Sequence, residues 1–289
     1  MVAGHSLGSV GGLVKGHGTE NDFLILADLD GRMALSSSAV RALCDRHSGV
    51  GADGVLRVVR TELANEPDVA AQADEAPFFM DYRNADGSIA EMCGNGVRVF
   101  ARYLRQTGLI DGDTKVATRG GTRSVRFDGE SVSVDMGPAV FRPERPTVVL
   151  ADGQSVTAIA AVDMPNPHVV VELPDDESLA ALDLSSVPSV SPALPEGQNV
   201  EYIVRVGPHA LAMRVHERGV GETRSCGTGI CAAVVAAAGA VRDSATWTVD
   251  VPGGRCEVSF SEAGTVILSG PAVLVAEVEL CAEWLPTHR

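Results

Sequence analysis

Two segments of the sequence share the pattern Cys-Gly-x-Gly ahead of a stretch that favours a helix. The first, NADGSIAEMCGNGVRVFARYL, contains Cys93, and the second, ERGVGETRSCGTGICAAVVAA, contains Cys226. When the two segments are aligned without gaps, the cysteines coincide and Asn84 falls on Glu217. An internal repeat of this kind predicts two similar halves, each of which contributes one cysteine.

A cysteine just before a helix has its sulfur near unpaired backbone N–H groups and the positive end of the helix dipole. This setting lowers the pKa of a thiol from its usual value of about 8.5. The glycines that follow let the backbone approach a ligand, and the free N–H groups can hold a carboxylate. We therefore expect Cys93 and Cys226 to approach one substrate carbon from opposite faces, as acid and base of a racemisation or epimerisation. The helix N-termini would stabilise the enolate-like state, so that neither a metal nor an organic cofactor is required.

The other four cysteines lack this setting. Cys231 lies inside an Ala-rich helical stretch, and Cys44, Cys256 and Cys281 lie in apolar patterns. Because buried cysteines behave as small apolar residues, we expect all four in the core. No Cys-x-x-Cys pair occurs, which argues against a zinc ribbon or a thioredoxin-type site.

Three asparagines lie in loops that suit a ligand site. Asn21 comes just before a predicted strand in KGHGTENDF, Asn166 lies between two prolines in DMPNPH, and Asn199 begins a strand after a Pro-Glu-Gly turn. Loops on a rigid scaffold often carry binding residues. An asparagine in a turn is more often satisfied by the local backbone, and this alternative stays open for each of them.

Three charged or titratable residues lie beside these motifs. His168 and Glu217 are the groups best suited to tune two thiols, by proton exchange or by their electric field. Arg218 is suited either to pair with Glu217 or to grip a carboxylate in a bidentate fashion. A lone histidine is more often a structural residue, so the assignment of His168 depends on its neighbours.

Composition and hydrophobic pattern predict the fold class. With 289 residues, of which 45% are hydrophobic, the chain lies near the size at which one core divides into two. Short alternating stretches outnumber helices and do not alternate with them, which favours an α+β fold with many half-buried antiparallel strands. We expect a capped helix over residues 36–46. The expected strands span residues 22–28, 55–59, 124–127, 131–135, 199–206 and 210–215.

The charge balance narrows the range of partners. There are 23 Lys and Arg residues against 38 Asp and Glu, a net charge of −15, which argues against nucleic acid and against anionic membranes. Lys15 and Lys115 are the only lysines, so a pyridoxal phosphate Schiff base has few candidates. The longest apolar stretch, residues 230–241, is too short to span a bilayer. The N-terminus does not resemble a signal peptide, so we expect a cytoplasmic protein.

Taken together, the motifs resemble those of the diaminopimelate epimerase family. HGTENDF, NADGSxxxxCGNGxR, NPH and ERGxGETxxCGTG occur in the family's order, from about Lys15 to the C-terminus. The resemblance implies interconversion of LL- and meso-2,6-diaminopimelate, a small-molecule amino acid, in lysine and peptidoglycan precursor synthesis. It also implies that no cofactor or metal takes part, and that the protein is a homodimer.

The resemblance further implies a fold of two pseudo-symmetric halves, each a curved, mostly antiparallel sheet or barrel around a central helix. We expect residues 1–135, completed by a C-terminal strand over residues 275–289, to carry Cys93, and residues 136–274 to carry Cys226. The active site is expected in the cleft between the halves. The proline-containing tract at residues 138–153 is the expected domain junction.

Carried over position by position, the resemblance assigns the acid/base pair to Cys93 and Cys226 and the tuning of their thiols to His168 and Glu217. The positions that match substrate contacts in the family are Asn21, Asn84, Gly94, Asn95, Asn166, Asn199, Glu217, Arg218, Gly227 and Thr228. Gly54 stands where the family often has Gln, and Pro165 where it usually has Gly. We therefore expect one substrate contact to be missing or replaced.

Two other functions stay open at this point. Proline and hydroxyproline racemases resemble this chain in the cysteine pair, but usually carry His in place of Asn95 and lack the ERGxGET motif. A redox-sensing protein whose two thiols form a regulatory disulfide is an alternative of another class. It predicts no exchange of a substrate α-hydrogen with solvent.

Overall fold

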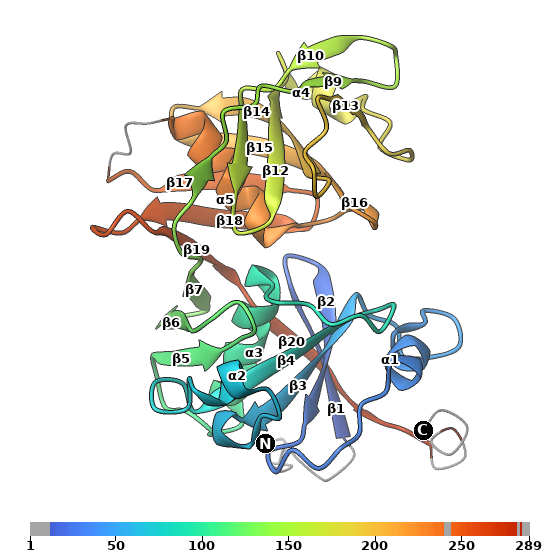
Figure 1. Ribbon diagram of the computed structural model, residues 1–289, viewed down its shortest axis with the longest axis vertical. Coiled ribbons are helices and arrows are strands. Elements are labelled where there is room, and N and C mark those ends of the chain that lie inside the picture. Colours follow the sequence, from blue (N-terminus) through green and yellow to red (C-terminus); the bar gives the residue numbers. More distant parts are fainter. Residues whose placement is uncertain (1–11, 240–243, 282–283, 285–289) are drawn as a thin grey trace. The chain divides into compact units, whose positions relative to one another are not determined.

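The computed structural model describes residues 12–239, 244–281 and 284, and Figure 1 shows the course of the chain. The chain forms two compact units. The N-terminal unit comprises Met1–Val134 and Pro271–Arg289, and the C-terminal unit comprises Asp135–Gly270. The tract at residues 138–153 lies within the C-terminal unit, so the junction falls before it and not in it. The prolines of this tract are followed by strands that pair inside the unit.

The sheet of the N-terminal unit begins with β20, the last strand of the described part of the chain. In the part that the structure describes, its order is β20-β1-β2-β3-β4-β5-β6-β7, with parallel pairs at β2–β3 and β4–β5. The other neighbours are antiparallel. The bounds are β1 Gly12–Gly18, β2 Asn21–Ala27, β3 Gly54–Arg60, β4 Phe78–Asn84, β5 Thr114–Ala117, β6 Arg123–Asp128, β7 Ser131–Asp135 and β20 Val273–Glu279.

The sheet of the C-terminal unit repeats this topology. Its order over the described residues is β8-β11-β12-β14-β15-β17-β18-β19, and the parallel pairs, β12–β14 and β15–β17, occur at the same two places. The internal repeat seen in the sequence is therefore a repeat of the sheet topology. The bounds are β8 Val140–Phe141, β11 Ala160–Asp163, β12 Pro167–Glu172, β14 Asn199–Gly207, β15 Ala210–Glu217, β17 Trp247–Val251, β18 Gly254–Phe260 and β19 Val266–Pro271.

Among the described residues, each unit has one long helix that its sheet surrounds. In the N-terminal unit, α3 (Gly94–Gln106) contacts β1 to β5 and β20, and in the C-terminal unit, α5 (Gly227–Ala238) contacts β11, β12, β14, β15, β17 and β18. Most residues of α5 are apolar and buried, as expected for a helix enclosed on all sides. A strongly curved sheet around a central helix in each unit confirms the predicted fold class.

Short elements complete the fold. A 3-10 turn (Thr61–Leu63) and α2 (Pro67–Ala70) follow β3, and α4 (Asp176–Ala180) follows β12. β16 (Gly221–Thr223) pairs with β15, and β9 (Thr147–Val149) pairs with both β10 (Ser155–Thr157) and β13 (Ser189–Ser191) in a small separate sheet. No helix within the described ranges is both long enough and apolar enough to cross a bilayer.

The helix and the six strands predicted from local pattern are all present. α1 (Ser37–Cys44) begins after Ser36, whose side chain accepts a hydrogen bond from the Ala39 amide, as expected for an N-cap. The predicted C-terminal strand is β20, which ends at Glu279. Residues 282–283 and 285–289 of that prediction, and residues 240–241 of the apolar stretch, lie outside the described residues.

The expectation that these strands are half-buried is wrong for β3, which is buried along most of its length. One face of β2 and β3 packs under α1, where Leu24 and Val55 join Val40 in one cluster. On the other face, Phe23 and Leu56 contact the first turn of α3 at Gly96. Because helices cover both faces, the alternation of polar and apolar residues gives way to a continuous apolar run.

β14 is buried on both faces for the same reason. Tyr202 and Val204 join a cluster with Leu179 of α4 and Val148 of the small sheet. Towards the inside of the unit, β14 contacts α5. The burial extends over the first six residues of β14, and the charged residue Glu201 lies among them.

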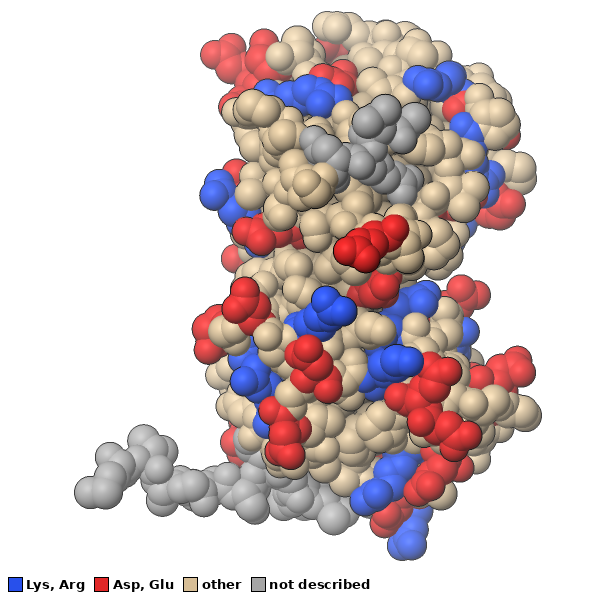
Figure 2. Space-filling view, turned by 90° about the vertical axis from the view of Figure 1, so that its left-hand side faces the viewer, with Lys and Arg blue, Asp and Glu red and all other residues tan. Residues whose placement is uncertain are grey.

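On the face drawn in Figure 2, Lys and Arg side chains are interspersed with Asp and Glu. A protein that binds nucleic acid gathers its basic residues on one face or along one helix. The drawn face does not have that arrangement.

Candidate active site

Both cysteines of the repeat are the N-cap residues of the central helices. Cys93 precedes α3 and Cys226 precedes α5, each in an extended backbone conformation. Each sulfur accepts a hydrogen bond from the backbone N–H three residues further on, at 3.4 Å from Gly96 N and 3.4 Å from Gly229 N. The sequence reasoning expected this position for both sulfurs, and the structure has it in both units.

In the N-terminal unit, Asn21 lies beside the sulfur. The Sγ atom of Cys93 is 3.6 Å from Asn21 Oδ1, which also accepts from Asn95 Nδ2 at 3.2 Å. On its other side, Asn21 donates from Nδ2 to Asp53 Oδ2 at 2.7 Å. The Asn21 amide therefore turns its oxygen toward Cys93 and its nitrogen away from it.

A fully buried arginine fixes this orientation. Arg98 Nη2 donates to Asn95 Oδ1 at 2.6 Å and to Thr19 Oγ1 at 3.3 Å. Because a guanidinium only donates, Asn95 must present its oxygen to Arg98 and its nitrogen to Asn21. The side chain of Asn95, which the sequence placed among the substrate contacts, is thus engaged inside the unit and acts on Asn21.

A charged cluster holds the far side of Asn21. Asp53 accepts from Arg46 Nη2 at 2.7 Å and from the Asp22 amide at 3.1 Å, and Arg46 also binds both carboxylate oxygens of Asp22. Lys15 lies 2.5 Å from Asp22 and donates to the Gly51 carbonyl. Burial raises the pKa of Asp22, but hydrogen bonds from Arg46 and Lys15 outweigh it and lower this pKa to about 2.

The sequence reasoning missed Asp53 as a site residue, although the Gly-x-Gly-x-Asp run was a signal for it. Burial raises the pKa of Asp53, and the charge of Asp22 adds to this effect, while the hydrogen bond from Asn21 opposes it. The next residue, Gly54, explains one departure from the family. A Cβ atom at Gly54 would lie 2.5 Å from the Arg83 carbonyl oxygen, so this backbone leaves no room for a glutamine.

Asn84 and Gly94 lie at the two ends of the loop that leads to the helix. Asn84 is the last residue of β4, and its side chain donates to Ser88 Oγ at 3.0 Å while its carbonyl accepts from the Gly87 amide. Gly94 is the first residue of α3 and is buried. Asn84 thus organises the loop, and Gly94 presents backbone at the helix N-terminus.

The surroundings of Cys226 are acidic. Its Sγ atom lies 3.5 Å from Thr228 Oγ1. Burial raises the pKa of this thiol well above its ordinary value, and the charges of Glu217 and Glu201 raise it further. The expectation that the helix N-terminus lowers the pKa is therefore wrong for Cys226, because loss of solvent and two nearby carboxylates outweigh the helix amide.

Glu217, at the end of β15, takes part in the same group. Its carboxylate accepts from Thr223 Oγ1 at 2.5 Å. Burial raises the pKa of Glu217, and the charge of Glu201 adds to the rise, while hydrogen bonds from Thr223 and Cys226 oppose it. A thiol and a carboxyl group with raised pKa values, in contact with each other, can exchange a proton.

His168 and Glu201 form a buried pair in the same unit. His168 Nδ1 lies 2.7 Å from Glu201 Oε1, and both side chains are fully buried. His168 Nε2 lies 3.0 Å from Asn166 Oδ1, so the histidine connects Glu201 to Asn166. The sequence reasoning missed Glu201, because nothing in the run NVEYIV separates a buried glutamate from an exposed one.

Asn199 and Arg218 meet at the edge of this group. Asn199 Oδ1 accepts from the Arg218 amide at 2.9 Å, and Asn199 Nδ2 lies 3.5 Å from His168 Nδ1. The guanidinium of Arg218 donates to the carbonyl of Glu196. Gly227 and Thr228 are the first two residues of α5, and both are buried.

Asn21 and Asn166 occupy equivalent positions in the two sheets. β2 and β12 are the third strands of their sheets, and each pairs in parallel with the fourth. This pairing begins at Phe23 in β2 and at His168 in β12, so both asparagines lie two residues ahead of it. The two units thus place an amide side chain at the same point of the same topology.

The remaining cysteines agree with the core assignment in three of four cases. Cys44, Cys231 and Cys256 are buried, but Cys281 is exposed. Cys281 lies just after β20. Its neighbour Leu280 packs partly against the core, whereas Cys281 faces solvent. Cys281 is therefore a correction to the expectation.

Comparisons with known proteins agree with one another. The family model described as diaminopimelate epimerase matches residues 13–142 and 160–275. The diaminopimelate epimerase of Streptomyces coelicolor is 49% identical over 283 residues, which cover 94% of this chain and 96% of that protein. The diaminopimelate epimerase of Thermobifida fusca is 51% identical over 269 residues, covering 91% and 95%.

Solved structures resemble the fold at low sequence identity. A phenazine biosynthesis protein of the PhzF family from Bacillus anthracis matches with a TM-score of 0.68 and 15% identity, covering 94% of this chain and 99% of that chain. A probable proline racemase from Agrobacterium radiobacter, with bound carbonate, matches with a TM-score of 0.65 and 15% identity, covering 94% and 93%. At this identity the likeness establishes the shared fold.

Proposed function

The chain belongs to the diaminopimelate epimerase family, and from this premise we propose that it interconverts LL- and meso-2,6-diaminopimelate by two-base catalysis. Cys93 and Cys226 are the acid and base. The observation that carries the proposal is that both sulfurs cap a central helix in the same way and accept the same helix amide. Two equivalent thiols, one in each unit, suit inversion of a single carbon.

In the proposed reaction, one cysteine as thiolate takes the α-proton of the substrate, and the other cysteine as thiol gives a proton to the opposite face. The electron pair of the broken C–H bond moves into the α-carboxylate, which becomes enolate-like. Backbone N–H groups in the first turns of α3 and α5 stabilise this charge. The reverse direction exchanges the two roles, so each cysteine serves as acid in one direction and as base in the other.

Residues near the cysteines can transfer protons and bind the charged ends of the substrate. Glu217 can receive the proton of Cys226, because the two groups lie in contact and the raised pKa of Glu217 makes it a better proton acceptor. Asn84, Asn166, Asn199 and Arg218 offer amide and guanidinium groups to the charged ends of the substrate. Diaminopimelate carries an amino-acid group at each end, and a set of amides and charges suits the end that does not react.

The proposal extends to the setting of the protein. As a diaminopimelate epimerase it acts in lysine and peptidoglycan precursor synthesis, in the cytoplasm, on a small amino acid and without metal or organic cofactor. We propose a homodimer. Light scattering coupled to size-exclusion chromatography tests this last point, with a mass near 60 kDa expected for twice the 30.0 kDa chain.

Solvent deuterium tests the reaction. LL-diaminopimelate incubated with the protein in deuterium oxide should gain deuterium at the α-carbon and yield the meso isomer. Cys93→Ala and Cys226→Ala should each abolish epimerisation, whereas Cys281→Ala, which removes an exposed thiol, should retain it. Near-normal turnover in either of the first two variants would refute the two-base assignment. A parallel assay with proline as substrate tests the alternative that the protein is a proline racemase.

A further inference from the structure

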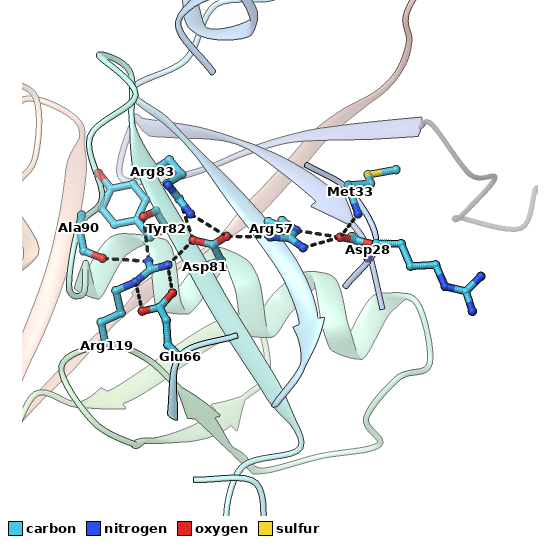
Figure 3. A network of polar contacts seen from close by, with 10 residues as sticks. Asp28, Met33, Arg57, Glu66, Asp81, Tyr82, Arg83, Ala90 and Arg119 are labelled. Carbon is cyan, nitrogen blue, oxygen red and sulfur yellow. Dashed lines mark hydrogen bonds and ion pairs between the residues drawn. The ribbon is translucent and has the colours of Figure 1, made fainter. Parts of the chain in front are cut away.

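A network of charged side chains lies beside the segment that leads to Cys93, and the acid/base chemistry makes no use of it (Figure 3). All of its members belong to the N-terminal unit. Its centre is Asp81 on β4, whose side chain is 2% exposed and contacts three guanidinium groups. The network consists of Asp28, Arg57, Glu66, Asp81, Arg83 and Arg119.

Arg119 differs from the other arginines in what it binds. Its Nε and Nη2 atoms bind Glu66 at 2.7 and 2.6 Å, and Nη2 also binds Asp81 at 2.6 Å. The remaining nitrogen, Nη1, donates to the carbonyls of Tyr82 at 3.3 Å and Ala90 at 3.5 Å. A guanidinium has five N–H groups, so these contacts engage all of them.

The carbonyl of Ala90 belongs to the loop that ends at Cys93. The Ala90 amide also donates to the Tyr82 carbonyl at 3.2 Å, and the Gly120 amide donates to the Glu91 carbonyl at 3.2 Å. Gly120 also lies close to Met92, since a Cβ atom added at Gly120 would be 3.4 Å from Met92 Cβ. Two of the three residues before Cys93, Ala90 and Glu91, are therefore hydrogen-bonded to the segment Arg119–Gly120, and Met92 lies close to it.

The side chains of the other two arginines bind Asp81, and the contact of Arg83 with the loop is a backbone bridge to Ile89. The side chain of Arg83 binds Asp81 at 2.9 Å, and that of Arg57 bridges Asp81 and Asp28. Burial raises the pKa of Asp81, but hydrogen bonds from Arg83 and Arg119 outweigh it and lower this pKa below its usual value. Asp81 is thus a fixed anion against which Arg119 is anchored.

We propose that Arg119 is a positioning residue for Cys93. Anchored by Glu66 and Asp81, it fixes the loop carbonyls just before the N-cap and so sets where the Cys93 sulfur lies relative to the first turn of α3. Its effect on turnover rests on the proposed function, whereas its effect on the sulfur does not. Lysine cannot replace it, because one ammonium group cannot span two carboxylates and two carbonyls.

Arg119→Lys and the matched control Arg83→Lys test the proposal. Both variants keep the charge and both side chains contact Asp81, but only the side chain of Arg119 donates to a loop carbonyl. Because a displacement of about 1 Å at a reacting group can cost up to about 100-fold in rate, kcat should fall at least tenfold in Arg119→Lys with KM within twofold. Arg83→Lys should keep kcat within twofold. Equal losses in both variants would overturn the proposal, since they would indicate general weakening of the network.

Chemical rescue separates positioning from folding. In Arg119→Ala, guanidinium chloride at low millimolar concentration should restore part of kcat by binding between Glu66 and Asp81, whereas methylammonium should not. Restoration by both cations alike, or by neither while the variant remains folded, would count against the proposal. Arg83→Ala with the same additions is the control, and its kcat should respond to neither.

A measurement that needs no substrate distinguishes failure of the positioning role from failure of the proposed function. The rate of alkylation of Cys93 by iodoacetamide, followed by peptide mass spectrometry, should change severalfold in Arg119→Lys and stay constant in Arg83→Lys. If the wild-type protein is inactive, but the alkylation rate of Cys93 changes in Arg119→Lys and not in Arg83→Lys, the proposed function is refuted and the positioning role is supported. An unchanged alkylation rate and normal turnover in Arg119→Lys would overturn the positioning role.

Discussion

Asn21 and Asn166 lie at equivalent positions in the two units, but their amides have different partners. Asn21 donates its Nδ2 to Asp53 and turns Oδ1 toward the Cys93 sulfur. Asn166 turns Oδ1 toward His168 Nε2, and no described residue accepts from its Nδ2. The Asn21 amide is therefore an acceptor on the side of Cys93.

This polarity comes from charged neighbours and can be tested by reversing it. In Asn95→Asp, a carboxylate oxygen faces Asn21 Oδ1, and Asn21 cannot rotate because Asp53 holds its Nδ2. We expect a loss of about 1–3 kcal/mol in the free energy of unfolding. Adding Asp53→Asn supplies an amide that can donate to Asn21 Oδ1, so the double variant should be more stable than Asn95→Asp alone.

Thermal unfolding followed by circular dichroism measures both effects. Asp53→Asn by itself should lower Tm, since it weakens the charged hydrogen bond from Arg46. Asp53→Asn should therefore lower Tm in the wild type and raise it in Asn95→Asp. If Asp53→Asn lowers Tm equally in both, the orientation of Asn21 is not transmitted from Arg98 through Asn95.

The His168–Glu201 pair predicts non-additive stability. Removing one partner of a buried pair leaves the other without compensation, at a cost of about 3–5 kcal/mol. We therefore expect His168→Leu and Glu201→Leu each to be strongly destabilising, and the double variant to cost less than the sum. Urea unfolding at pH 7 gives the three free energies. Additive losses would mean that the two side chains are not coupled.

Cys226 should remain a thiol at neutral pH. Burial and the charges of Glu217 and Glu201 raise its pKa. The difference in thiolate absorbance at 240 nm between the wild type and Cys226→Ser reports on Cys226, and it should appear only well above pH 9. Glu217→Gln removes one charge and should move this titration to lower pH. Glu222→Gln, which removes an acid paired with Arg214, is the control and should leave it in place. A midpoint below about 8.5 in the wild type would contradict the prediction.

Acid should weaken the N-terminal unit through Asp22. The pKa of Asp22 is lowered to about 2, so its contribution to stability is fully present above the unfolded-state pKa of about 3.9 and is lost as the pH falls through 2. Asp22→Asn should reduce Tm at pH 7 and flatten the decrease of Tm between pH 4 and 2. An equally steep decrease in that variant would show that other carboxylates dominate.

The pattern of residues determined much of the local structure. The Ser36 cap predicted the start of α1, alternation located β7 and β15, and the gapless match of Cys93 with Cys226 predicted two similar units. These features depend on neighbours in the chain, since caps and strand periods are short-range. The same reasoning placed both sulfurs at helix N-termini.

Only the tertiary structure decided the environment of each cysteine. The acids that act on Cys226 come from β14 and β15. The Asn21 amide beside Cys93 is oriented by Asp53 and, through Asn95, by Arg98, and both are distant from Asn21 in sequence. A helix N-terminus by itself favours a thiolate, but burial with two carboxylates reversed this for Cys226. The sequence therefore determined which residues cap the helices, and packing decided their protonation, because desolvation and charge act through space and not along the chain.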